Sequence, residues 1–131
     1  MSLARASERS TKRRIVVIDD SVTILASVRV ALEQRGFEVQ TASDPSELAT
    51  GDVHQAALVV VDVQMEQVFG DDVVRIMREV WEVTAPILLY SSLPLSELIE
   101  RAQASGATGA VCKANGVGAL CEQVQRALEA Q

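Results

Sequence analysis

Four short apolar runs lie along this chain, and each of them ends on a charged or hydroxylic residue. The runs cover residues 15–18, 57–61, 86–90 and 110–112. They are followed, in chain order, by Asp19 and Asp20, Asp62, Ser91 and Ser92, and Lys113. Short apolar runs of this kind are typical of parallel strands that are covered on both faces. If they are parallel strands, their polar ends lie together at the sheet edge where open α/β folds bind ligands.

Segments with apolar residues at helical spacing separate the runs, so the chain alternates strand and helix patterns. We expect strands at residues 15–18, 37–41, 57–61, 87–90 and 110–112. We expect helices at residues 22–35, from residue 45, at 70–81, from residue 95 to Gly106, and at 117–130. This (βα)₅ pattern predicts an α/β fold, a doubly wound, flavodoxin-like sheet of five parallel strands.

The helical spacing also predicts which side chains face the sheet. Apolar residues that are expected to point inward include Val30, Ile76, Val80, Leu95 and Ile99. Asp44 is expected to cap the second helix, and Pro45 is expected to begin it. That helix should be brief, because Gly51 and Asp52 are expected to interrupt it.

The length of 131 residues allows one domain with its own core and hardly allows two. No apolar stretch approaches the roughly 20 residues of a membrane span, and the charged N-terminus lacks the apolar segment of a secretory signal. The two cysteines, Cys112 and Cys121, are too few for a disulfide framework. We therefore expect a cytoplasmic domain that has no membrane contact.

Charge is distributed unevenly along the chain. The formal net charge is −6, but residues 1–14 carry five basic side chains and one acidic one, which leaves −10 for the rest. An acidic body with only four aromatic residues repels phosphates and offers few stacking surfaces, so we expect no direct nucleic acid binding. Residues 1–13 are expected to form a flexible, basic N-terminal arm, and residues 14–131 are expected to form the folded domain.

Asp19, Asp20 and Asp62 are predicted to lie close together at the sheet edge. Three neighbouring carboxylates repel one another, which raises the pKa of at least one of them unless a cation lies among them. Mg²⁺ fits this description, because it prefers hard oxygen ligands and joins carboxylates to phosphate groups. An adjacent pair of aspartates also occurs at helix caps, and Asp20 or Ser21 could cap the helix that follows. Asp19 and Asp20 alone are therefore weak support for a metal site.

Asp62 follows a fully apolar strand, where burial of a carboxylate without a partner is costly. Carboxylates can act as nucleophiles toward phosphorus and form aspartyl phosphates. Lys113 could hold a phosphoryl oxygen as a point charge, and Ser91 could donate a hydrogen bond to the phosphoryl group. The alternatives for these two residues are a surface lysine and a helix-capping serine. Together, the four strand ends favour phosphoryl transfer to Asp62.

From about residue 14 onward, the chain closely resembles the receiver domain of two-component response regulators. The resemblance rests on Asp19-Asp20, Asp62-Val63-Gln64-Met65 with Gly70 eight residues after the aspartate, Ser91-Ser92, and Gly106-Ala107-Thr108-Gly109 before Lys113. It implies the strand order 2-1-3-4-5 and a phosphoacceptor role for Asp62, which Ser91 and Lys113 would assist. It also implies that Mg²⁺ is bound by Asp19, Asp20, Asp62 and the backbone carbonyl of Gln64.

Three positions depart from the family pattern. Ala110 stands where an aromatic switch residue is usual, Ala114 where a proline commonly follows the lysine, and Glu66 where a proline usually follows Met65. These departures leave the acids, the hydroxyl and the amine in place. They bear on how a signal is read at the helix that follows Pro94. Tyr90 is a candidate contributor to that face, and ordinary strand packing is the alternative for this residue.

The resemblance implies a phosphohistidine donor, carried by a sensor histidine kinase or a histidine phosphotransfer protein. Phosphorylation would then switch a partner-binding face or a homodimer formed through the last two helices. The alternative is an interaction or oligomerisation module of the same fold that signals without phosphate, which Ala110 favours. A turnover enzyme is not expected, since Gln64 stands where a haloacid-type phosphatase needs a second acid. A free-standing receiver and a part of a larger regulator both remain open.

Overall fold

The computed structural model describes residues 12–131, and within them five parallel strands form a single sheet. The strands are β1 (Arg14–Ile18), β2 (Glu38–Ala42), β3 (Leu58–Val61), β4 (Ile87–Ser91) and β5 (Gly109–Cys112). Their spatial order is β2-β1-β3-β4-β5, and every neighbouring pair is parallel. The predicted fold class and strand order are therefore confirmed. The predicted N-terminal arm lies outside the described residues, apart from residues 12 and 13.

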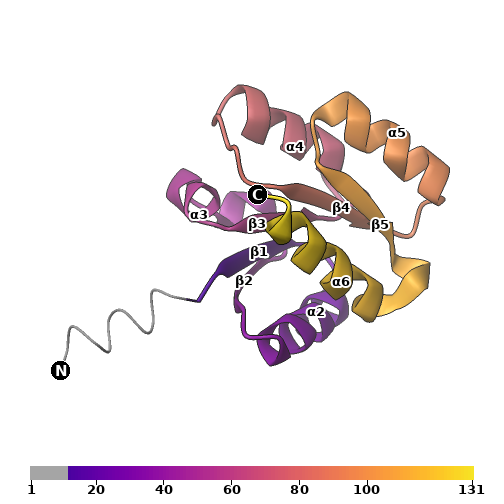
Figure 1. Cartoon of the computed structure of the whole chain (residues 1–131). Coiled ribbons are helices and arrows are strands. Elements are labelled where there is room, and N and C mark those ends of the chain that lie inside the picture. The colour runs from indigo at the N-terminus through magenta and orange to yellow at the C-terminus, as the bar shows by residue number, and fades with distance from the viewer. Residues whose placement is uncertain (1–11) are drawn as a thin grey trace.

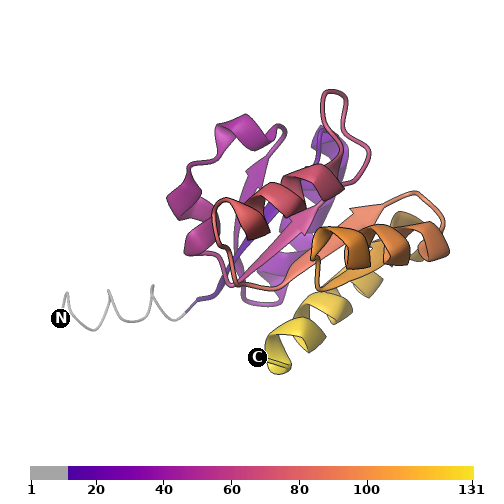
Figure 2. The same ribbon diagram turned by 90° about the horizontal axis from the view of Figure 1, so that it is seen from above.

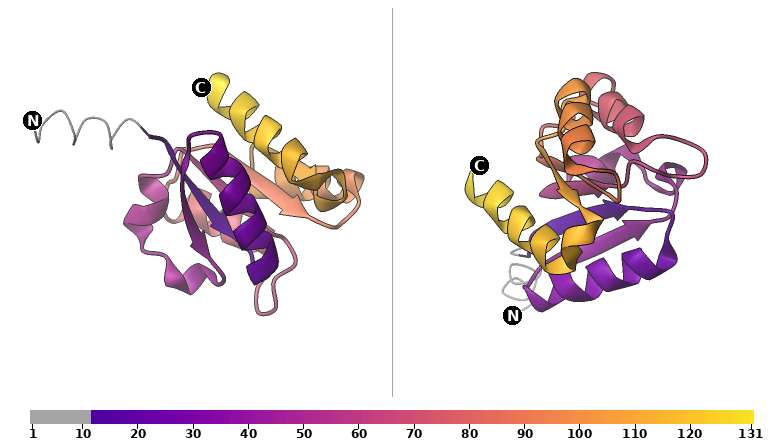
Figure 3. Two further views of the ribbon diagram at one scale, coloured as in Figure 1. Left: turned by 90° about the horizontal axis from the view of Figure 1, so that it is seen from below. Right: turned by 90° about the vertical axis from the view of Figure 1, so that its right-hand side faces the viewer.

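Helices cover both faces of this sheet, as parallel strands require. The helices of the described part are α2 (Val22–Gln34), α3 (Thr50–His54), α4 (Gly70–Glu79), α5 (Leu95–Ser105) and α6 (Gly116–Glu129). Figure 1 shows α4 and α5 on one side of the sheet and α2 and α6 on the other. From above, α4 and α5 lie side by side (Figure 2), and from below, α2 and α6 do the same (Figure 3).

Alternate residues of each strand enter two hydrophobic clusters, one on each face. Ile15 and Val17 of β1 pack with side chains from α2 and α6, whereas Val16 and Ile18 pack with side chains from α3, α4 and α5. Each fully buried aliphatic side chain contributes about 1.5–3 kcal/mol to the free energy of folding. The two clusters hold the strands in register, and that register decides which residues meet at the sheet edge.

Several apolar residues that were predicted to face the sheet lie on the outer surface instead. The exposed ones are Val30, Ile76, Val80, Leu95 and Ile99. A helix on a sheet buries one stripe, as α2 does with Leu25, Val28 and Leu32. Val30 stands two residues from Val28 and points away from that stripe. The predictions for these residues were wrong because helical spacing alone does not measure the width of the covered face.

The segment before β3 also differs from the prediction. Residues Pro45–Glu47 form a single 3₁₀ turn that Asp44 caps by accepting a hydrogen bond from the Ser46 backbone (2.8 Å). The chain is extended at Leu48 and Ala49, and α3 then includes Gly51 and Asp52 rather than being interrupted by them. Asp52 accepts a hydrogen bond from the Ala49 backbone (2.8 Å), which satisfies one free N–H at the start of α3.

None of the helices within residues 12–131 has the length and apolar character needed to cross a membrane.

Candidate functional site

The carboxyl ends of β1 and β3 bring two aspartates to the centre of the sheet edge. Ile18 and Val61 are partners in the register of these strands, and Asp19 and Asp62 directly follow them. Asp62 continues the ladder, because its backbone N–H donates to the Ile18 carbonyl (2.9 Å). One carboxylate oxygen from each of Asp19, Asp20 and Asp62 lies within 4.8 Å of the others. The strand pairing thus gathers three acids at a single point.

The two central acids are almost fully withdrawn from water. Asp19 is 2% exposed and Asp62 is 3% exposed, whereas Asp20 is exposed. Burial, and next the negative charge of Asp19, raise the pKa of Asp62 to about 6, while Lys113 and the Gln64 backbone act in the opposite direction. Asp62 is therefore ionised at neutral pH, but burial and the charge of Asp19 make its ionised form less stable than that of an exposed carboxylate. A cation or a charge-balancing partner would offset that difference.

Lys113 follows β5 and places its amine between the buried acids. Its Nζ lies 2.8 Å from Asp19 Oδ2 and 3.4 Å from Asp62 Oδ2. The first contact is an ion pair by distance, yet Asp19 Oδ2 makes no hydrogen bond of accepted geometry within the described part of the chain. A buried anionic oxygen is therefore left without a directed partner. One amine also leaves two of the three negative charges unbalanced.

These observations fit a divalent cation with oxygen ligands. One carboxylate oxygen of Asp19 lies within 4.8 Å of oxygens from two further carboxylates, and Mg²⁺ is a hard cation that few carboxylates and several waters can hold. Asp19 Oδ1 accepts from the Ser21 backbone (2.9 Å), which fixes the orientation of the carboxylate. Ser21 is also the N-cap of α2, because its hydroxyl accepts from the Ile24 backbone (3.3 Å). Of the two capping candidates, Asp20 and Ser21, the structure therefore shows Ser21.

The loop after β3 is folded tightly against Asp62. A Cβ on Gly70 would lie 1.9 Å from the backbone oxygen of Asp62, so only glycine fits at this position. The Gly70 N–H donates to the Val63 carbonyl (2.8 Å), and the Glu66 N–H donates to Asp20 Oδ2 (2.9 Å). Asp20 therefore positions this loop through its side chain. The sequence pattern did not reveal either contact.

The Gln64 side chain meets the hydroxyl groups at the end of β4. Its Oε1 accepts from Ser92 Oγ (3.0 Å) and, at a longer distance, from Ser91 Oγ (3.4 Å). Its backbone N–H donates to Asp62 Oδ1 (3.2 Å). Ser91 is fully buried, whereas Ser92 and Gln64 are exposed. Sequence reasoning considered only the backbone carbonyl of Gln64 and missed its amide.

Of the two alternatives for Tyr90, a contribution to the face of α5 or ordinary strand packing, the structure shows the packing. Its side chain is 2% exposed and belongs to the cluster beneath α2 and α6, on the side of the sheet opposite α5. The packing alternative is therefore confirmed, and its physical reason is that neighbouring strand residues point to opposite faces, with Ser91 pointing to the other one. Lys113 Nζ lies over the Tyr90 ring, 5.8 Å from its centroid.

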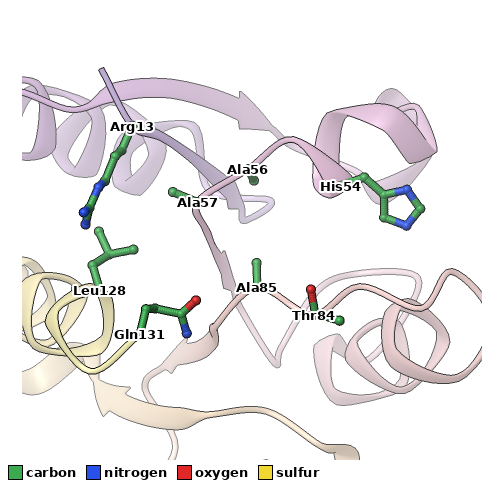
Figure 4. Close-up of a pocket in the computed structure, with 8 residues that line it drawn as sticks. All are labelled: Arg13, His54, Ala56, Ala57, Thr84, Ala85, Leu128 and Gln131. Carbon is green, nitrogen blue, oxygen red and sulfur yellow. The ribbon is translucent and has the colours of Figure 1, made fainter. Parts of the chain in front are cut away.

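The opposite edge of the sheet carries a hollow of about 350 Å³. It is lined by Arg13, His54, Ala56, Ala57, Thr84, Ala85, Leu128 and Gln131 (Figure 4). Arg13 and His54 lie at opposite ends of it, and the imidazole of His54 contacts the Trp81 carbonyl. No two ionisable side chains of this lining converge. The acidic edge is accordingly the candidate site.

Comparison with protein families is consistent with this geometry. The sequence model of the response regulator receiver domain matches residues 15–125. The CAI-1 autoinducer sensor kinase/phosphatase CqsS of Vibrio cholerae is 32% identical over 105 residues, which are 78% of this chain and 15% of that protein. The alkaline phosphatase synthesis transcriptional regulatory protein PhoP of Bacillus subtilis is 31% identical over 81 residues, 61% of this chain and 33% of that protein.

Solved structures of similar shape include a chemotaxis protein and a receiver domain. The chemotaxis protein CheY4 of Vibrio cholerae is 28% identical with a TM-score of 0.78, covering 88% of this chain and 98% of its own. The BeF3-activated DrrB receiver domain is 26% identical with a TM-score of 0.77, covering 90% of this chain and 98% of its own. DrrB is a protein of Thermotoga maritima. By contrast, the chain spans only 15% to 60% of the length of the curated relatives that it matches.

Proposed function

Since this chain belongs to the response regulator receiver domain family, as its sequence predicted, we propose that Asp62 accepts a phosphoryl group from a phosphohistidine. The observation that carries the proposal is the placement of a buried, costly carboxylate beside two further acids and 3.4 Å from the Lys113 amine. The donor is a sensor histidine kinase or a histidine phosphotransfer protein. The transfer takes place in the cytoplasm and involves neither nucleic acid nor membrane.

In the proposed reaction, an ionised oxygen of Asp62 attacks phosphorus in line with the leaving histidine nitrogen. The P–N bond breaks, an acyl phosphate forms on Asp62, and the electron pair of the broken bond stays on the imidazole. A pKa of about 6 leaves the carboxylate ionised at neutral pH. The Lys113 amine lies close enough to Asp62 to form an ion pair with a phosphoryl oxygen once the phosphoryl group is attached there.

Asp19, Asp20, Asp62 and the Gln64 backbone carbonyl are the groups that would hold Mg²⁺. When bound, Mg²⁺ supplies charge neutralisation and alignment of donor and acceptor, which are most of what phosphoryl transfer requires. Asp19 and Asp62 are positioned by adjacent strands, and Asp20 by its bond to the loop. The domain promotes its own phosphorylation and dephosphorylation and is not a turnover enzyme.

The phosphoryl group brings about −1.5 to −2 charge to the site at neutral pH. The Ser91 hydroxyl would break its hydrogen bond to Gln64 Oε1 and donate to a phosphoryl oxygen instead, because a charged oxygen is a stronger acceptor than the amide oxygen. This movement begins at the start of the segment between β4 and α5, so it can alter the exposed face of α5. Leu95 and Ile99 lie on that face, and a partner or a second copy, contacting α5 and α6, would read the change.

One observation favours a second function, an interaction module of the same fold that signals without phosphate. Ala110 offers no ring at the usual switch position, and it lines a hollow that Leu95, Cys112 and Asn115 also line. Such a module would bind its partner equally well with and without a phosphoryl group. In the experiment below, absence of a phosphoryl adduct on the wild-type protein would favour this module.

The deciding experiment is intact-mass measurement after incubation with a small phosphodonor and Mg²⁺. We expect one phosphoryl adduct on the wild-type protein and none on Asp62→Asn. His54→Ala at the opposite sheet edge serves as the matched control and should take up the adduct normally. Absence of an adduct on the wild type, or an equal adduct on Asp62→Asn, would reject Asp62 as the acceptor.

A further inference from the structure

Within residues 12–131, Tyr90 is the one aromatic residue that lies in a strand, and its ring lies beneath the Lys113 amine. It is the residue before Ser91 in β4 and is the register partner of Val111 in β5. The ring is nearly inaccessible to water and shares its cluster with Leu88 and with Leu120 and Cys121 of α6. Well-packed neighbours on the strand and the helix therefore fix where the ring lies.

Lys113 needs such a fixed neighbour. It stands after the end of β5, in a 3₁₀ turn, so no ladder of hydrogen bonds sets the direction of its long side chain. The side chain is only 18% exposed, and the ion pairs to Asp19 and Asp62 lie at its tip. The ion pair to Asp62 must rearrange when the charge on Asp62 changes. The Tyr90 ring carries no charge that changes with the state of Asp62, so its contact with the amine can persist.

We propose that Tyr90 is a positioning residue that holds the Lys113 ammonium over its ring and thereby keeps the amine within reach of Asp62. The face of an aromatic ring is negative, and it attracts a cation within about 6 Å of its centroid. The Nζ lies over the ring at 5.8 Å, which satisfies this condition. Because the attraction comes from the ring, Tyr90→Phe should preserve the position of the Lys113 amine, whereas Tyr90→Leu should not.

The effect on phosphorylation rests on the proposed function, but the position of Lys113 does not. The first measurement is therefore the proton NMR shift of the Lys113 ε-methylene group, which an aromatic ring displaces when it lies against it. We expect the displaced shift in the wild type and in Tyr90→Phe, and its loss in Tyr90→Leu. Leu88→Val changes the same cluster without touching Lys113 and should keep the displaced shift.

The second measurement is the rate of phosphorylation by a small phosphodonor with Mg²⁺. Tyr90→Leu should slow it by about threefold to tenfold, as expected for the loss of a partly desolvated cation–π contact. Tyr90→Phe should restore the rate to within about twofold of the wild type. In a Lys113→Met background, the change from Tyr90 to leucine should have no further effect, because the cation is already gone.

Two results would overturn the proposal. One is an unchanged Lys113 shift in Tyr90→Leu, which would mean that the ring does not contact the amine in solution. The other is equal slowing by Tyr90→Leu in both backgrounds, which would assign Tyr90 to core packing alone. If the wild type takes up no phosphoryl group, the proposed function fails, and the NMR comparison still decides whether Tyr90 positions Lys113.

Discussion

The two edges of the sheet differ sharply, although the same five strands form both. At the carboxyl edge, Asp19, Asp62 and Lys113 converge from three strands, and two of these side chains are nearly inaccessible to water. At the amino edge, Arg13 and His54 lie at opposite ends of the hollow. The contrast follows from the parallel arrangement of the strands, which brings all carboxyl ends to one edge of the sheet and all amino ends to the other. The chemical character of the carboxyl edge then depends on the residue that follows each strand.

The backbone around Asp62 is packed more closely than the backbone of α3, the helix that carries His54. Gly70 lies against the Asp62 carbonyl, whereas Gly51 in α3 has open space where a side chain would project. We expect Gly70→Ala to lower the free energy of unfolding by about 3 kcal/mol, because the backbone around Asp62 must shift. Gly51→Ala should raise it by about 0.5–1 kcal/mol. Urea denaturation measures both, and similar small effects at the two positions would contradict the close approach.

Charge burial at the carboxyl edge should appear as a dependence of stability on pH. The pKa of Asp62 is raised from 3.8 to about 6, so the folded protein binds more protons than the unfolded chain between these values, and stability falls as pH rises through them. Asp62→Asn should therefore stabilise the protein by about 2 kcal/mol above pH 6, in a chelator, with the gain vanishing below about pH 4. Urea denaturation at pH 7 and pH 4 checks this, and a gain of equal size at both values would rule out the charge as its cause.

Cation binding provides a third contrast between the edges. Mg²⁺ at about ten times its dissociation constant should raise the free energy of unfolding by about 1.4 kcal/mol. Asp19→Asn should remove most of that increase, since it neutralises the carboxylate whose buried oxygen lacks a directed partner. His54→Ala should leave it unchanged. Thermal denaturation with and without Mg²⁺ provides the measurement, and equal stabilisation of the Asp19→Asn variant would place the ion elsewhere.

The smallest expected effect concerns the contact between Gln64 and the serines. Gln64→Ala removes an exposed acceptor from Ser91 and Ser92, so the Ser91 hydroxyl becomes free to donate to a phosphoryl oxygen. We expect about a twofold rise in the phosphorylated fraction at steady state, as fits a weak, partly exposed hydrogen bond. Intact-mass spectra of the two proteins under the same donor conditions test this. A lower fraction would mean that the Gln64 amide assists the reaction.

Much of the fold was predictable because it depends on local patterns. Four strands were recognised from apolar runs, and Gly36, which has a φ of 90°, marks the end of the first helix. The errors arose where the answer depends on distant partners. Gly51 was expected to break a helix, but α3 includes it, because Asp52 accepts a hydrogen bond from the Ala49 backbone at the start of that helix. Val30 faces water because the sheet beneath α2 covers only one stripe of the helix.

The candidate site divides in the same way. Asp19, Asp62, Ser91 and Lys113 could be chosen from sequence, because the end of a strand is a local property and parallel strands share one edge. The contacts that tune these residues could not be chosen. The hydrogen bond from Glu66 to Asp20 joins residues 46 positions apart, and the Lys113 amine meets a ring 23 positions earlier in the chain.

By itself, the sequence determined that carboxylates, a hydroxyl and an amine follow the strands, because residue type and the position of a strand can both be recognised from short stretches of the chain. Only the tertiary structure decided that Asp19 keeps a buried oxygen without a directed partner, that Gln64 engages the serines, and that Tyr90 lies under Lys113. These contacts depend on how α6, β4 and the loop after β3 pack around one another. Packing is a property of many residues at once, so no single stretch of the chain specifies it.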